Sequence, residues 1–185
     1  MSNRLALAFE LIDAANAKDP SGEALRYGQR MSETLDSYQP EAAESLRIAA
    51  RAQHIERWTI PRASYPEGRI AYLTWRKDLQ KMHATRAGEI MTACGYGEED
   101  IARTGALLRK ERLKVDADAQ TLEDVICLVF LAHEAPEFIA RHDDAKVTDI
   151  LAKTAKKMSP AGLAAAGRLN LDGRLARLLG KALAS

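Results

Sequence analysis

Apolar residues recur at the spacing of an amphipathic helix along most of the chain, and the alternation typical of strands is nearly absent. Leu5, Ala8, Ile12 and Ala15, for example, fall on one helix face. Prolines and glycines separate such segments. The predicted helices span about residues 5–15, 20–37, 40–57, 69–94, 98–113, 121–133, 145–157, 160–168 and 172–183. This pattern predicts an all-α fold, built as one compact helical domain over residues 1–185.

The segment from Thr121 to His133 differs from the other predicted helices, because apolar residues surround it. Leu122, Val125 and Phe130 form one face, while Cys127 and its neighbours occupy the rest. A helix that is apolar on every side is buried. We therefore expect the central helix of the fold near residues 121–133.

The stretch LRIAARAQHIERWTIPR, residues 46–62, begins as an amphipathic helix and turns polar on the face that should be buried. At about 100° per residue, the apolar stripe that includes Ala50 continues into Gln53, His54 and Arg57. Buried polar groups destabilise a core unless they are paired. A stripe of this kind is typical of a pocket floor, and we expect a ligand site there.

Arginine and aromatic residues cluster between residues 51 and 76. A guanidinium group binds carboxylate or phosphate as a planar fork, and it stacks on aromatic rings. The alternative is that the aromatic side chains belong to the core and the arginines form surface ion pairs. We expect an anion site. Together with Gln53, the predicted ligand-binding residues are Arg51, Arg57, Trp58, Arg62, Tyr72, Trp75 and Arg76.

Two of the four histidines share helix faces with this cluster, His54 with Gln53 and His83 with Arg76. Histidine suits proton transfer near neutral pH and metal ligation. The predicted catalytic residues are therefore His54 and His83, with Glu123 and Asp124 as carboxylate partners. The alternative for the two carboxylates is a favourable charge at a helix N-terminus. Lys110 is a candidate phosphate contact, or simply a solvated lysine.

The composition is that of a globular protein, with 46% hydrophobic and 29% charged residues. Cys94 and Cys127 form no CxxC motif, so zinc binding through cysteines is not expected. The N-terminal apolar pattern contains Glu10 and Asp13, unlike a secretory signal. The longest apolar run, residues 125–132, is too short for a membrane span. We expect a cytoplasmic protein with no membrane partner.

The net charge of +1 hides an uneven distribution. From Ala145 onward the chain has eight Lys/Arg against two acidic residues, which leaves the remainder acidic. We expect the basic helical region 145–185 to dock on the rest of the domain. The alternative is that this region binds an anionic partner such as RNA.

The pattern RAQHIERWTIPRASYPEGRIAYLTWR (51–76), followed by His83 and TLEDV (121–125), resembles a bacterial and fungal family known only as a domain of unknown function. The resemblance spans nearly the whole chain. It implies a shared fold and no particular activity.

More remotely, the layout is similar to the HD-domain superfamily of metal-dependent phosphohydrolases. AARAQHIE (49–56) looks like the helix that carries the His-Asp doublet, and TLEDVICLVFL (121–131) looks like the helix with the last aspartate, here Asp124. This resemblance implies one divalent transition-metal ion held by His54, His83 and Asp124. The chain departs from the pattern, because Gln53-His54 stands where His-Asp is expected and the first histidine has no match.

The sequence thus predicts an enzyme, an HD-like hydrolase of a small phosphorylated or otherwise anionic metabolite. The alternative is a non-catalytic HD-like module that binds an anionic ligand or a nucleic acid such as tRNA. A third reading is a helical interaction protein whose polar stripe is covered by a partner. Substrate, metal identity and oligomeric state stay open at this level.

Overall fold

The computed structural model describes residues 2–113 and 115–183. All regular elements in these ranges are helices, which confirms the predicted all-α class. Contacts within the chain divide it into two compact units, Met1–Leu113 and Lys114–Ser185. The single-domain organisation and the HD-like arrangement stay predictions.

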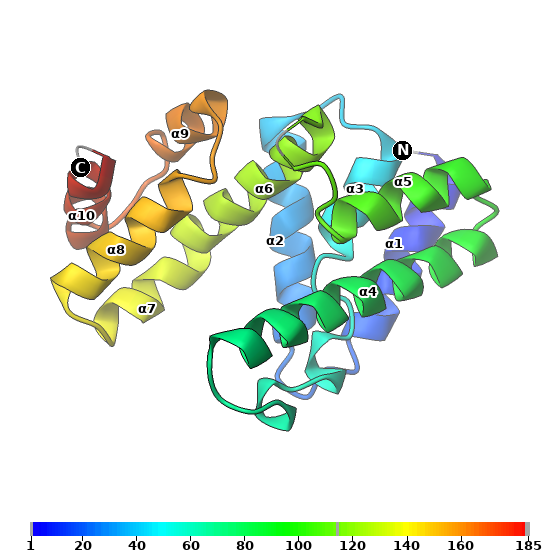
Figure 1. Cartoon of the computed structure of the whole chain (residues 1–185). Coiled ribbons are helices and arrows are strands. Elements are labelled where there is room, and N and C mark those ends of the chain that lie inside the picture. Colours follow the sequence, from blue (N-terminus) through cyan, green and yellow to red (C-terminus); the bar gives the residue numbers. More distant parts are fainter. Residues whose placement is uncertain (1, 114, 184–185) are drawn as a thin grey trace. The chain divides into compact units, whose positions relative to one another are not determined.

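The first unit is a bundle of five helices with two short 3₁₀ turns (Figure 1). The long helix α4 packs along α5, and α3 contacts α1, α2 and α5. Fully buried aliphatic side chains from several helices, such as Ile12, Leu46 and Leu79, form its core. The elements are α1 (Asn3–Asn16), α2 (Glu23–Tyr38), α3 (Glu44–Arg51), η1 (Arg57–Thr59), η2 (Arg62–Ser64), α4 (Arg69–Ala93) and α5 (Glu98–Leu108).

Helix α3 ends at Arg51, earlier than the predicted 57. Gln53 and His54 therefore lie in the turn that follows α3 and do not continue its stripe. The backbone of Glu56 is left-handed, with φ 49°, and its N–H donates to Asn16 Oδ1 at 3.1 Å. The prediction of a continuous helix was wrong here, because the hydrogen bond from Glu56 to Asn16 of α1 stabilises a non-helical backbone at Glu56.

Helices α2 and α3 approach each other closely at Gly28. A Cβ atom at this position would lie 2.8 Å from the carbonyl oxygen of Arg51. A backbone carbonyl oxygen cannot shift without moving the helix end that carries it. Because Gly28 has no side chain, the end of α3 can pack directly against α2. The turn with Gln53 and His54 begins directly after this contact.

The second unit centres on one long helical run that passes from α6 through a π-helical segment into α7, with α8 alongside α7 (Figure 1). Leu122, Val125 and Leu131 in this run are buried, which agrees with a buried helix near 121–133. The elements are α6 (Ala117–Val129), η3 (Phe130–Glu134), α7 (Ala135–Ala140), α8 (Asp144–Ala155), α9 (Pro160–Ala166) and α10 (Gly173–Leu183).

Helix α6 begins at Ala117, earlier than the predicted start at about residue 121. The side chain of Asp116 accepts hydrogen bonds from the N–H groups of Asp118 and Ala119, so it caps the helix. This cap satisfies N–H groups of the first turn, and the helix begins at Ala117.

None of the described helices combines the length and the apolar character that a membrane span requires.

Candidate functional site

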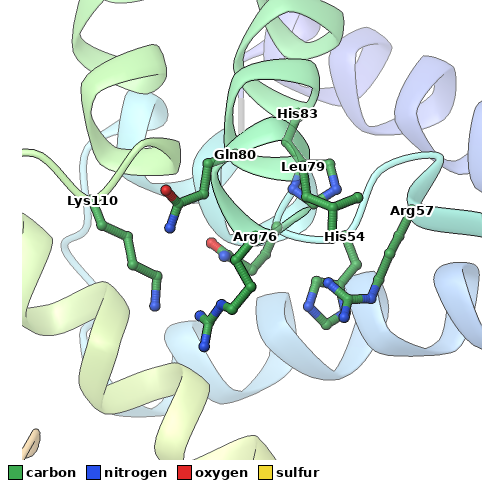
Figure 2. Close-up of a pocket in the computed structure, with 8 residues that line it drawn as sticks. His54, Arg57, Arg76, Leu79, Gln80, His83 and Lys110 are labelled. Carbon is green, nitrogen blue, oxygen red and sulfur yellow. The ribbon is translucent and has the colours of Figure 1, made fainter. Parts of the chain in front are cut away.

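A small pocket in the first unit brings together eight residues from the turn after α3, from η1, from α4 and from the turn after α5 (Figure 2). Its volume is about 30 Å³, far below that of a typical cofactor site. The pocket therefore admits the end of a ligand rather than a whole one. The lining residues are Gln53, His54, Arg57, Arg76, Leu79, Gln80, His83 and Lys110.

Three of the lining side chains are cations, Arg57, Arg76 and Lys110. They come from three different segments, and in Figure 2 all three extend downward from their backbones. No Asp or Glu occurs among the lining residues that the structure describes. An excess of fixed positive charge without a lining carboxylate attracts anions and repels cations.

Two imidazole rings face each other across the pocket. The centroids of His54 and His83 are 6.2 Å apart, and the ring of Tyr27 stacks on His54 at 3.8 Å. Burial and the charge of Arg57 lower the pKa of His83 to about 3. Burial, and then the neighbouring positive charges, that of Arg57 first, hold the pKa of His54 well below its usual value. Both rings are therefore neutral at pH 7.

Two buried polar atoms of the pocket have no hydrogen-bond partner among the described residues. These atoms are Oε1 of Gln53 and Nε2 of His83, on side chains that are 6% and 3% exposed. A buried polar atom without a partner is destabilising, and native proteins rarely leave one unsatisfied. A polar ligand that enters the pocket would satisfy them.

Aromatic residues hold the arginine side of the pocket in place. The guanidinium group of Arg57 lies over the ring of Trp75, 4.6 Å from its centroid. The indole N–H of Trp75 donates to the carbonyl oxygen of Ile60 at 2.8 Å, which ties α4 to the segment after η1. Arg76 lies over the ring of Tyr72 at 5.9 Å. Trp75 and Tyr72 thus support the two arginines from outside the lining.

The turn that carries His54 is fixed by an ion pair between distant segments. Arg86 of α4 donates from Nε to the Glu56 carboxylate at 2.7 Å. Together with the bond from Glu56 N–H to Asn16, this contact anchors the turn to both α4 and α1. Arg86 and Glu56 were not among the residues predicted from the sequence. The sequence shows that the two residues have opposite charges. It shows neither that they are in contact nor that the backbone of Glu56 is left-handed.

Of the predicted ligand-binding residues, five lie outside the lining, namely Tyr72 and Trp75, described above, and Arg51, Arg62 and Trp58. Arg51 forms a bidentate ion pair with Asp13. Arg62 donates to the carbonyl oxygens of Tyr65 and Pro66, which shapes the loop. Trp58 lies in η1, partly buried.

The predicted carboxylates Glu123 and Asp124 belong to the second unit, where both are buried. The carboxylate of Asp124 accepts from the backbone N–H of Ser159 at 2.8 Å and from its hydroxyl at 2.5 Å. Gln120 Nε2 donates to it as well, at 3.1 Å. These contacts connect α6 to the start of α9, so the surroundings of Asp124 are those of a structural carboxylate.

The donor set of the pocket does not fit the metal ion that the HD resemblance implies. Such an ion would meet two imidazoles and three cationic side chains, with no lining carboxylate to offset its charge. Among the described residues, no group of three or more His, Cys, Asp and Glu is arranged to hold a metal ion. The pocket fits an anion better.

Sequence reasoning missed two lining residues and underrated a third. Leu79 and Gln80 lie one helical turn beyond Trp75 and Arg76 on α4, and this spacing is the signal that was available. Lys110 carries no such signal, because it follows α5 far along the chain and reaches the pocket only through the packing of α5 on α4.

The comparisons with known proteins concern the family alone. No curated protein and no solved structure matches the chain. One family model matches residues 6–179, nearly the whole sequence, and its description is domain of unknown function (DUF4202). The kind of family indicated by the pattern over residues 51–76 is therefore confirmed, and the chain belongs to the DUF4202 family of unknown function.

Proposed function

We propose that the first unit binds a small oxyanion, such as the phosphate group of a metabolite, in the pocket between His54 and His83. The observation that carries the proposal is the convergence of Arg57, Arg76 and Lys110 on a cavity without a lining carboxylate. Hydrogen bonds from cationic donors to an anion are stronger than neutral ones.

The two unsatisfied polar atoms give the proposal a second support. The neutral ring of His83 can donate from Nε2 to an anionic oxygen, depending on its tautomer. The amide of Gln53 can present either its oxygen or its NH₂ group to the ligand. The small volume favours one terminal anionic group, with the remainder of the ligand outside.

Binding of inorganic phosphate by the full chain tests this function. We expect phosphate to raise the melting temperature, since a ligand that binds only the folded state stabilises it, whereas chloride at the same ionic strength does not. Arg76→Gln removes one charged donor and should weaken binding by about tenfold or more. Isothermal titration calorimetry measures the change in Kd.

Arg69→Gln is the matched control, because Arg69 is an exposed arginine of the same helix outside the lining. It should leave the phosphate affinity nearly unchanged. Equal losses in the two variants would indicate a general charge effect, and the pocket would not be the site.

A second candidate function is hydrolysis of a phosphoester bound in the same pocket. The pair of neutral imidazoles favours it, because a neutral imidazole can accept a proton from an attacking water molecule. His54 is the better placed of the two, since its residue is half-buried whereas His83 is fully buried.

Turnover of p-nitrophenyl phosphate tests the hydrolase. If His54 is the general base, His54→Asn should lower kcat by about 100-fold or more, while His142→Asn in the second unit should not. Absence of turnover by the wild-type chain, together with tight phosphate binding, would leave the binding function and exclude hydrolysis of this ester.

A further inference from the structure

His54 and His83 lie close together in the wall of the pocket, where a bound anion would contact them. His83 lies in the middle of α4 and is 3% exposed, with Nε2 unsatisfied among the described residues. His54 comes from the turn after α3, and the two ring planes are tilted by 47° at a centroid separation of 6.2 Å. Both rings line the cavity into which the anion would enter.

The charged and titratable groups that face this pair come from every neighbouring segment of the pocket. Tyr27 of α2 stacks on His54, while Arg57, Arg76 and Lys110 approach from η1, α4 and the turn after α5. All three charges are positive. Burial of the rings is the main reason that the pKa of both is low, and the charge of Arg57 lowers both further. Lys110 and Arg76 add to this effect at His54.

A bound dianion would favour the protonated form of a histidine, which the pocket alone disfavours. Its negative charge offsets the three cations, and one of its oxygens can accept a hydrogen bond from a protonated imidazole. Both effects favour the charged form of histidine. The rings stay buried, and burial still disfavours the imidazolium form. In the complex, however, the imidazolium would have the anion as a counter-ion at hydrogen-bonding distance.

We propose that a tetrahedral dianion enters this pocket together with a proton, which passes from solvent to the His54–His83 pair, so that the site takes up anions preferentially at acidic pH. The inference rests on the proposed anion-binding function and adds its regulation. In the free protein both rings are neutral near pH 7, and in the complex one is an imidazolium paired with the anion. By linkage, affinity then rises as pH falls, by at most about tenfold per pH unit for each proton taken up.

Sulfate is the appropriate probe, because it is a tetrahedral dianion that does not itself change protonation near neutral pH. Calorimetric titration of the full chain with sulfate at about pH 6, in two buffers of different ionisation enthalpy, gives the number of protons taken up. We expect up to about one proton per sulfate and a Kd that increases between about pH 5.5 and 7.5.

His83→Gln removes one of the titrating groups and keeps a polar side chain in its place. It should reduce the proton uptake and flatten the pH dependence of Kd. His142→Gln is the matched control in the second unit, where His142 stacks on Phe138, and it should keep the wild-type uptake. The imidazole resonances of the wild-type chain, followed by NMR during the sulfate titration, provide the same information should His83→Gln fail to fold.

The outcomes separate the two proposals. Sulfate binding with no proton uptake, a pH-independent Kd and unshifted imidazole resonances would overturn the proton coupling and leave the anion site standing. If neither sulfate nor phosphate binds across this pH range, the anion site itself is wrong, and the coupling falls with it.

Discussion

At the scale of single residues, Asp124 shows how a structural carboxylate can resemble a catalytic one in the sequence. It stands near the middle of the buried helix α6 and matches the last aspartate of a metal-binding pattern. In the structure its oxygens accept hydrogen bonds from the backbone and hydroxyl of Ser159 and from Gln120. Gly162 lies so close that a Cβ atom there would be 2.6 Å from the carboxylate.

Asp124→Asn should therefore lower the free energy of unfolding of the second unit by about 1–3 kcal/mol, because an amide replaces one of the accepting oxygens. Phosphate binding should persist, since every lining residue belongs to the first unit. Chemical denaturation and calorimetry measure the two effects. Asp149→Asn, which removes only an exposed pair with Lys153, is the control and should change stability by less than about 1 kcal/mol.

The opposite result would indicate that Asp124 belongs to the ligand site. A variant of unchanged stability that no longer binds phosphate would show that the carboxylate contributes to binding, as the sequence suggested.

At the scale of elements, the end of α5 combines a helix cap with a side chain that lines the pocket. Lys110 N–H donates to Leu107 O and Glu111 N–H to Ala106 O, both at 3.0 Å, which is the Schellman arrangement. Lys110 occupies the left-handed position with φ 57°, where glycine is the usual residue. Left-handed residues other than glycine cluster at functional sites, and the side chain of Lys110 lines the pocket.

Lys110→Gly separates the two roles. The backbone should gain up to about 1 kcal/mol from relief of the left-handed conformation. Phosphate affinity should fall by about tenfold, because one cationic donor is lost. Thermal denaturation and calorimetry on the same preparation measure both quantities.

Arg112→Gly is the matched control, because Arg112 is also left-handed, with φ 54°, and lies outside the lining. It should share the backbone gain and keep the affinity. Should Lys110→Gly bind phosphate as tightly as the wild type, Lys110 would have no part in the site.

At the scale of the whole molecule, charge is distributed differently from what the sequence suggested. The basic excess after residue 145 is real, but the second unit begins at Lys114 and includes the acidic residues before it. Residues 114–185 contain ten Lys/Arg and ten Asp/Glu. Arg174 and Arg177, for instance, both pair with Asp144. A balanced unit offers less attraction for RNA than an isolated basic tail.

The sequence by itself determined the helical class, the approximate extent of most helices and the central part of the site. Periodicity is a local property, so α1, α4, α8 and α10 are readable from spacing alone. The same spacing placed Arg76 and His83 on one face of α4. A predicted helical stripe pointed to Gln53, His54 and Arg57, although α3 ends before them.

Only the tertiary structure decided which of these residues meet. The end of α3 depends on Gly28, on Asn16 and on the pair of Glu56 with Arg86, contacts that join segments far apart in the chain. Lys110 enters the pocket because α5 packs on α4, whereas Asp124 is held by Ser159 in the other unit. The sequence specifies the chemistry of each side chain. Which distant segments come into contact follows from packing, and packing therefore determines which charged groups pair.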